Sequence, residues 1–441
     1  MDLSVEDHGG RVPIYDAAFA ADPAGVYETL RARYGNYAPA ELAPGVPVTV
    51  VLGYDAALGV LRDPATFPRD PRGWEKTRPA DCPMRPVIGY RPGMQCSDGG
   101  EHARFRKATT GALDRIDAAA LRRHVEQSAD LLIDRFAADG EADLYARYAG
   151  QLPLLVLSRL FGCPPDLSDR LVRGITDITE LVDLENAMAM VMQATLDLIA
   201  LKRAQPGSDI VSWMIEDPAG LTDEELLDQI GLFMAMGSGP VQNLVANTLR
   251  LLLSDERFAG DLSSGSMPIE DALDEVLWTD PPVANYGFTY PTYDVEREGY
   301  VMPADQPVVI AYKAANTDPS KRVDRRTGNR AHLAFSAGPH TCPAKGPARV
   351  ISSIAIEKLL DRLPDLDLAV PVNELQWRPG SFNRALTALP VRFTPVPVTV
   401  PASAPRPEPP RASPPAATAP PNVAAPGRRS LWGRLAAWWR A

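Results

Sequence analysis

A single cysteine stands in a loop of small residues and prolines, directly before a helical pattern. The loop, residues 332–349, reads HLAFSAGPHTCPAKGPAR, and apolar residues then recur at helical spacing from Ala348 to Leu363. A thiolate just before a helix start feels the positive end of the helix dipole, which lowers the thiol pKa and favours metal ligation. Pro347 delays the expected helix start to about residue 346 and weakens this effect. The loop presents Cys342 either as a metal ligand or as a buried structural cysteine.

The loop resembles the cysteine-ligand loop of the cytochrome P450 family, F-G-x-G-x-H-x-C-x-G. Four spaced residues match, and Ser336 and Ala344 stand at two glycine positions. The resemblance implies that Cys342 is the axial metal ligand of haem b. It implies a mainly α fold with small β-sheets, in one large triangular α-rich domain. The matching residues are Phe335, Gly338, His340 and Cys342, and the resemblance implies cofactor binding by Phe335, His340 and Cys342.

A second segment, GGEHARFRKATTGALDR, places His102 and Arg106 four residues apart, on one face of a predicted helix. Such a pair is most often a solvated helix face. Arginine also binds carboxylates through charge-assisted bonds, and histidine adds a donor. The pair matches the family's H-x-x-x-R motif. The resemblance implies that His102 and Arg106 bind the haem propionates, with His340.

A long uncharged stretch, residues 229–249, indicates the buried central helix of a soluble protein, because its polar residues argue against a membrane span. Thr222 and Glu225 form a predicted capping box before it. The stretch resembles the family's A-G-x-D/E-T-T signature, whose acid and threonine assist oxygen activation. Here these two positions are Gly239 and Pro240. The residues expected over the haem are Gly237, Gly239, Pro240 and Val241.

Proline inside a helix removes a backbone hydrogen bond and costs about 3 kcal/mol. We therefore expect the central helix to be kinked or broken at Pro240, with room for water or substrate. Gly239 and Pro240 cannot deliver a proton through a side chain, so ordered water or a substrate hydroxyl would have to do so. The alternative is a packing kink in a protein that no longer activates oxygen.

The segment DALDEVLW matches the family's E-x-x-R helix, with Glu275 kept and Trp278 in place of the arginine. Because an unpaired buried carboxylate is costly, Glu275 is expected to be protonated, exposed or paired with another arginine. The next β-rich region lacks the family's further propionate-binding arginine, since none occurs between Arg257 and Arg297. Haem anchoring then rests on His102, Arg106 and His340. The candidate partners for Glu275 are Arg322, Arg325, Arg326 and Arg330.

Composition narrows the function classes. The chain has 441 residues, 45% of them apolar, which is enough for a large core. Its formal net charge of −11 argues against nucleic-acid binding. The four cysteines show no CxxC pair, which fits a reducing cytoplasm, and the acidic N-terminal residues do not resemble a signal peptide.

The resemblance covers roughly residues 20–393, so we expect a haem domain over residues 1–394. Residues 395–427 are rich in proline and alanine and predict a disordered linker. Residues 428–441 form a basic, Trp-rich amphipathic segment. It suits an anionic membrane surface or a groove on a protein partner, and so predicts peripheral membrane attachment. The alternative for this segment is a disordered end.

The first functional hypothesis is a haem-thiolate monooxygenase that oxidises a small apolar molecule with O2 and electrons from ferredoxin and ferredoxin reductase. The second is a catalytically degenerate relative, acting as a sensor or auxiliary interaction partner in a membrane-tethered signalling complex. A third is a zinc site formed by His332, His340 and Cys342. The lost acid, threonine and arginine favour the second hypothesis, and the retained cysteine favours the first.

Overall fold

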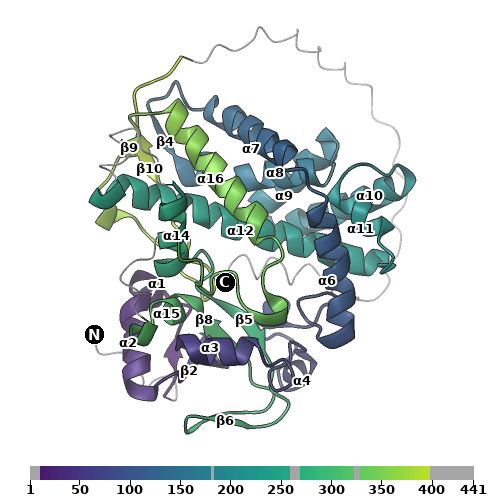
Figure 1. The fold of residues 1–441 in the computed structure, drawn as a ribbon, viewed down its shortest axis with the longest axis vertical. Coiled ribbons are helices and arrows are strands. Elements are labelled where there is room, and N and C mark those ends of the chain that lie inside the picture. Colours follow the sequence, from purple (N-terminus) through teal and green to yellow (C-terminus); the bar gives the residue numbers. More distant parts are fainter. Residues whose placement is uncertain (1–9, 180–182, 259–268, 322–327, 398–441) are drawn as a thin grey trace, which may run out of the picture.

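The computed structural model describes residues 10–179, 183–258, 269–321 and 328–397, and helices predominate in it (Figure 1). The predicted mainly α fold with small β-sheets is confirmed. The helices are α1 (Ala17–Ala21), α2 (Pro23–Tyr34), α3 (Tyr54–Leu61), α4 (Arg72–Lys76), α5 (Arg85–Ile88), α6 (Gly99–Asp114), α7 (Ala118–Ile133), α8 (Leu152–Leu160), α9 (Pro165–Thr179), α10 (Leu184–Ala204), α11 (Ile210–Glu216), α12 (Asp223–Ser254), α14 (Ile269–Thr279), α15 (Tyr312–Asn316) and α16 (Lys345–Arg362).

The strands form three small sheets. A five-stranded sheet has the order β1-β2-β3-β8-β5, in which β2 is antiparallel to β3, β3 is parallel to β8, and β5 is antiparallel to β8. The other two sheets are β4-β10-β9 and β6-β7. The strands are β1 (Val12–Pro13), β2 (Tyr37–Ala43), β3 (Val46–Val51), β4 (Glu141–Asp143), β5 (Asn285–Thr289), β6 (Val295–Arg297), β7 (Tyr300–Met302), β8 (Val308–Ala311), β9 (Asp367–Leu368) and β10 (Pro390–Arg392).

Helix α12 crosses the middle of the molecule, between the helices α7, α8 and α16 and the β-rich part that contains β5 and β8 (Figure 1). Its predicted capping box between Thr222 and Glu225 is present. Of the kink or break expected at Pro240, the break does not occur, because α12 is helical at every residue through Pro240. Proline still leaves the Met236 carbonyl without its amide donor. Packing on both sides of α12 compensates for this loss. No described helix is long and apolar enough to span a bilayer.

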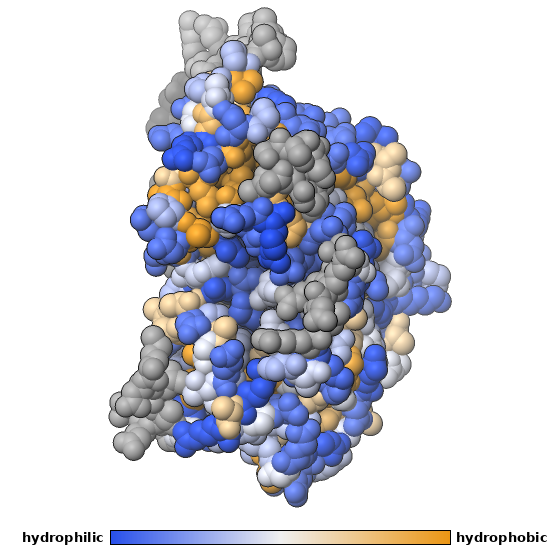
Figure 2. Space-filling view, turned by 60° about the vertical axis from the view of Figure 1, so that its left-hand side comes forward, coloured by the Kyte–Doolittle hydropathy of each residue, from blue (hydrophilic) through white to orange (hydrophobic). Residues whose placement is uncertain are grey.

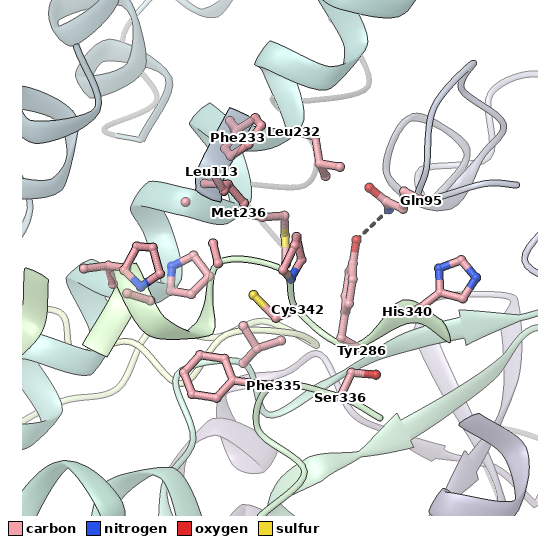
Figure 3. Close-up of a pocket in the computed structure, with 18 of the residues that line it drawn as sticks. Gln95, Leu113, Leu232, Phe233, Met236, Tyr286, Phe335, Ser336, His340 and Cys342 are labelled. Carbon is pink, nitrogen blue, oxygen red and sulfur yellow. Dashed lines mark hydrogen bonds between the residues drawn. The ribbon is translucent and has the colours of Figure 1, made fainter. Parts of the chain in front are cut away.

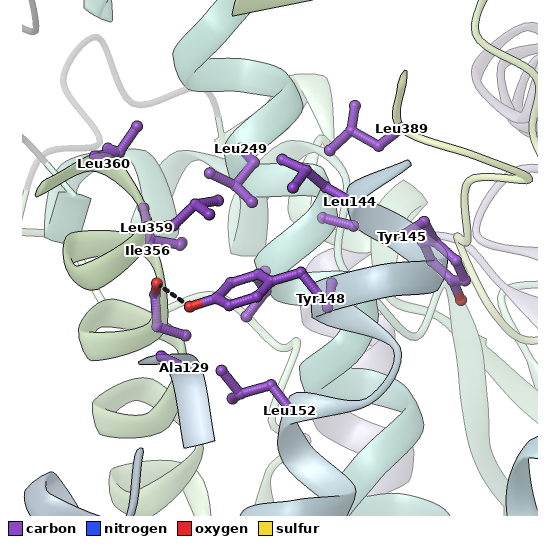
Figure 4. Packing of buried hydrophobic residues seen from close by; sticks show 14 of the residues in the cluster. Ala129, Leu144, Tyr145, Tyr148, Leu152, Leu249, Ile356, Leu359, Leu360 and Leu389 are labelled. Atoms are coloured by element: carbon purple, nitrogen blue, oxygen red, sulfur yellow. Dashed lines mark hydrogen bonds between the residues drawn. The ribbon is translucent and has the colours of Figure 1, made fainter. Parts of the chain in front are cut away.

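The largest apolar core joins α7, α8, α12 and α16 (Figure 4). Tyr148, in the short π-helical turn Tyr145–Ala149, is fully buried there, and its hydroxyl donates to the carbonyl of Ala355 at 2.7 Å. This bond ties the turn to α16, the helix that follows Cys342. The core therefore fixes α16 and α12 relative to each other.

A buried carboxylate on α12, Asp228, predicts a pH dependence of stability. Burial raises its pKa from 3.8 to about 6, although Arg91 opposes the shift. The folded state binds more protons than the unfolded state between these two pKa values, so stability falls as pH rises through them. We expect this group to lower the free energy of unfolding by about 1.4 kcal/mol between pH 5 and pH 8.

Urea unfolding of the wild type and of Asp228→Asn at both pH values measures this contribution. The amide does not ionise, so the stability of the variant should fall less over the same interval. Equal pH slopes for the two proteins would show that Asp228 titrates normally in the folded state.

The domain ends slightly later than predicted. The amide of Val396 donates to the carbonyl of Ala137 at 2.7 Å, and Val396 packs against the main core. The first residues of the predicted linker, 395–396, are therefore part of the domain. Residues 398–427 of the linker and the segment 428–441 lie outside the described residues. Figure 2 shows a face that is mostly hydrophilic, with hydrophobic side chains gathered in its upper part.

Candidate functional site

Cys342 opens into a cavity beneath α12 (Figure 3). Its amide donates to the carbonyl of Phe335 at 2.9 Å, which closes the loop on itself, and a short 3-10 turn, Gly338–His340, lies between them. Together with the open solvent at its mouth, the cavity has an empty volume of about 1570 Å³. Its roof and walls are largely apolar. The apolar lining includes Leu232, Phe233, Met236, Val241 and Leu244 of α12 and Leu157 of α8.

The electrostatics at Cys342 differ from the prediction. Helix α16 begins at Lys345, close to the expected start at about residue 346, and Pro347 lies in its first turn. The pKa of the Cys342 thiol is nevertheless raised, because desolvation outweighs the hydrogen bond from the Ala344 amide and the nearby charges of Arg106 and Lys345. The expectation of a lowered thiol pKa is wrong for the protein without a metal. A bound metal cation reverses this balance, since a coordinating thiol is deprotonated.

Two residues of the cysteine loop adopt left-handed backbone conformations. Gly338 has φ +68°, and a Cβ atom there would lie 2.2 Å from the carbonyl oxygen of Leu61. Ser336 has φ +60°, at a position where the resembling family has glycine. A side chain in this region costs about 1–2 kcal/mol relative to a right-handed conformation. The loop therefore requires glycine at 338 and tolerates serine at 336 under strain.

We expect Ser336→Gly to stabilise the protein by about 1 kcal/mol, because glycine adopts φ +60° without a Cβ clash. Chemical unfolding of wild type and variant measures the difference. Ser353→Gly is the matched control: Ser353 lies within α16, where glycine weakens the helix. A loss of stability in both variants would contradict the account of strain.

One end of the cavity is polar. His102 and Arg106 of α6, together with His340, line it, and the two imidazole rings lie 4.1 Å apart. His102 is buried, its Nε2 atom has no hydrogen-bond partner, and burial and the neighbouring His340 lower its pKa to about 4. His340 Nε2 contacts Asp98 Oδ1 at 3.1 Å. The structure thus brings together Phe335, His102, Arg106, His340 and Cys342, as predicted from the sequence.

This arrangement fits an iron porphyrin with carboxylate side chains. A cysteine sulfur on the floor can ligate the iron, and an apolar cavity can enclose the macrocycle. The orphaned Nε2 of His102 and the guanidinium of Arg106 supply donors for carboxylates at one end. The polar donors thus match the carboxylates of the porphyrin, and the apolar walls match its macrocycle.

The predicted residues of α12 divide into two groups. Gly237, Pro240 and Val241 line the cavity, on one face with Met236 and Leu244. Gly239 does not line it, and nothing lies within 4 Å of where its Cβ would be. The expectation that Gly239 faces the haem is wrong, because one residue advances a helix by about 100° and turns position 239 off the cavity face.

Sequence similarity to characterised proteins shows the family of this chain. The chain is 34% identical over 391 residues to cytochrome P450 monooxygenase PikC of Streptomyces venezuelae, covering 85% of this chain and 92% of the relative. The chain belongs to the cytochrome P450 family. It is also 32% identical to cytochrome P450 107B1 of Saccharopolyspora erythraea, over 87% of this chain and 98% of the relative. It is a P450-type monooxygenase of small organic substrates, and its cofactor is haem b. A comparison with protein-family models gives no match.

Solved structures show the same P450 fold. CYP154C4 from a Streptomyces species matches with a TM-score of 0.78 and 28% identity, over 87% of this chain and 98% of that one. CYP154A1 from Streptomyces coelicolor matches with a TM-score of 0.74 and 27% identity, over 86% of this chain and all of that one, 100%. The agreement extends over nearly the whole described part of this cytochrome P450.

The structure places Glu275 near an arginine that the sequence analysis did not name. Glu275 lies 3.7 Å from Arg257, while Arg330 pairs with Glu270 and Asp274 instead. The other three candidate arginines lie outside the described residues. Trp278, in place of the family arginine, donates its indole N–H to the carbonyl of Asn329 at 2.6 Å. The indole thus ties α14 to the segment that leads to the cysteine loop.

The zinc alternative has no geometric support. His332 is buried against the rings of Trp278 and Phe335. In the described part of the chain, no group of three His, Cys, Asp or Glu side chains is placed to hold a metal ion.

Sequence reasoning missed several polar residues of the cavity, among them Arg69, Gln95 and Tyr286. Gln95 donates to the hydroxyl of Tyr286 at 2.6 Å (Figure 3), and Arg69 lies at the polar end. Arg69 and Gln95 come from the Pro- and Gly-rich stretch at residues 67–95, and Tyr286 comes from β5. A long irregular stretch in a compact domain is usually functional, but only the fold shows which of its side chains enter the cavity.

Proposed function

We propose that this cytochrome P450 oxidises an apolar small molecule, with electrons from ferredoxin and ferredoxin reductase, at a haem held by the thiolate of Cys342. The observation that carries the proposal is the cysteine sulfur opening into an apolar cavity under an intact α12. When bound, haem b supplies the activation of O2 and the insertion of one oxygen atom into substrate.

The residues of the chain have separate tasks in this proposal. Cys342 ligates the iron, and the loop between Phe335 and Cys342 holds the sulfur in place through the Cys342 amide. His102, Arg106 and His340 bind the propionates. The apolar face of α12 excludes bulk water and orients the substrate by shape, because it offers few polar groups.

Proton supply distinguishes this chain from the family pattern. The residues of α12 that line the cavity carry no titratable side chain, as Pro240 and Val241 stand beside the position of the missing acid. Protons must therefore reach the site through water or through a hydroxyl group of the substrate. The carbonyl of Met236, one turn before Pro240, lacks the amide donor that another residue at 240 would supply, and it is an acceptor that can hold such a water.

Relatives support a mainly apolar substrate. One, from Micromonospora griseorubida, is named as a mycinamicin IV hydroxylase/epoxidase, and another, from Saccharopolyspora erythraea, as a 6-deoxyerythronolide B hydroxylase. Polyketide-sized molecules are compatible with a cavity bounded by the side chains of α8 and α12.

Reconstitution with a plant-type ferredoxin, its reductase and NADPH tests the proposal on a panel of macrolactones, steroids and fatty acids. The expected result is at least one product heavier by one oxygen atom, with a matching share of the electrons consumed. Release of all the electrons as hydrogen peroxide with every compound would contradict it and favour the interaction-partner hypothesis.

We further propose that residues 428–441 attach the protein to an anionic membrane surface. Four arginines and three tryptophans in this segment support the proposal. The full chain should sediment with vesicles rich in phosphatidylglycerol at low salt, and a chain ending at residue 397 should not. Equal sedimentation of both chains would contradict the proposal.

A further inference from the structure

Arg69 is a buried cation at the polar end of the cavity. It follows Phe67 in the turn before α4, is 8% exposed, and lines the cavity with His102, Arg106 and His340. One of its guanidinium nitrogens, Nη1, donates to the carbonyl of Phe288 at 3.0 Å. Among the described residues Arg69 forms no ion pair. A buried arginine without an anionic partner is costly, so its surroundings point to an anion.

The cavity offers no protein anion for this charge. Asp98 is the candidate, since its Oδ2 accepts a hydrogen bond from the backbone amide of Arg69, and the charge of Arg69 is one of the causes that lower the pKa of Asp98. Its other oxygen, Oδ1, contacts His340. The carboxylate therefore holds the loop and the imidazole, and it leaves the Arg69 guanidinium directed at the cavity.

Charge balance points to the propionates of haem b. Two propionates carry two negative charges. Arg106 and Arg69 are the two arginines that line the described cavity, and together they balance these charges.

The position of Arg69 also accounts for a gap in the sequence. No arginine occurs between Arg257 and Arg297, the stretch that contains β5. Arg69 contacts this strand at Phe288, which lies 219 positions later in the sequence. Arg69 thereby brings a guanidinium group to β5 from a distant segment. We infer that Arg69 binds a haem propionate, in place of an arginine on β5.

The inference rests on the proposed haem site, and its test separates the two. Wild type and Arg69→Gln are reconstituted with haem or with haem dimethyl ester, whose propionates carry no charge. Release of each cofactor to excess apomyoglobin is then followed by absorbance. Because a charge-assisted pair is lost, Arg69→Gln should release haem about tenfold to a hundredfold faster than wild type. The ester should leave both proteins at similar rates.

Arg91→Leu is the matched control. Arg91 is also buried, but it donates to the carbonyls of Pro86 and Val87 and does not line the cavity. Its loss should change the release of haem and ester equally. Equal acceleration of both cofactors in Arg69→Gln, or no acceleration, would overturn the inference while the Cys342 ligation stands.

If Arg69→Gln does not load haem, Arg69→Lys replaces it. Lysine keeps the charge and loses the planar fork, so we expect a smaller acceleration that is still confined to haem. Acceleration of haem and ester alike would overturn the inference for this variant too.

Discussion

Replacing Arg349 by methionine is expected to lower the free energy of unfolding by about 3–5 kcal/mol. Arg349 lies on α16, seven residues after Cys342, and its Nη1 atom donates to Asp274 Oδ1 on α14 at 2.6 Å. The side chain of Asp274 is only 2% exposed. Among the described residues, methionine would leave this carboxylate with Arg330 alone, at 3.9 Å and on a mostly exposed side chain.

Urea unfolding of the haem-loaded protein measures the loss. Arg362→Met is the control on the same helix, because Arg362 pairs with the partly exposed Asp130 and Asp134. This control should lower the free energy of unfolding by less than about 1 kcal/mol. Adding Asp274→Leu to Arg349→Met should restore much of the stability, since it removes the unpaired charge. Failure of the second change to restore any stability would argue that Arg349 acts through packing alone.

Gly338→Ala is expected to abolish correct ligation of the haem. The new Cβ atom would lie 2.2 Å from the Leu61 carbonyl oxygen, which is backbone on α3 and cannot rotate away. The positive φ adds about 1–2 kcal/mol of strain. The loop must move away from α3, and Cys342 lies four residues further along it, so the sulfur leaves its position.

The bound haem content and the absorption spectrum of the purified variant measure this effect. Gly346→Ala is the control, because Gly346 lies in the first turn of α16 with nothing near its Cβ position. That variant should keep the wild-type spectrum. A wild-type spectrum for Gly338→Ala as well would mean that the loop can shift without moving the sulfur.

The sequence predicted the parts of the site that local patterns encode. Cys342 and His340 share one loop, and His102 and Arg106 share one helix face, so the family resemblance of these two short motifs was enough to place them. Arg69 could not be placed in this way, because its neighbours in the cavity come from distant segments and only the packing of the five-stranded sheet brings it there.

The errors have similar physical origins. Local propensity predicted a break at Pro240, but the packing of α12 against its neighbours keeps it helical. The dipole argument predicted a lowered pKa for the Cys342 thiol, but desolvation of the thiol itself outweighs the dipole and the nearby charges. The sequence analysis did not name Arg257 as a partner of Glu275, although the two side chains lie 3.7 Å apart. Each outcome depends on tertiary contacts that a linear pattern does not contain.

The absorption spectrum of the reduced protein with carbon monoxide tests the central claim most directly. The Soret band of a thiolate-ligated complex is expected for the wild type, and Cys342→Ser should lose that band. A wild-type band characteristic of a neutral ligand, or the thiolate band persisting in Cys342→Ser, would contradict the assignment of Cys342 as the axial ligand.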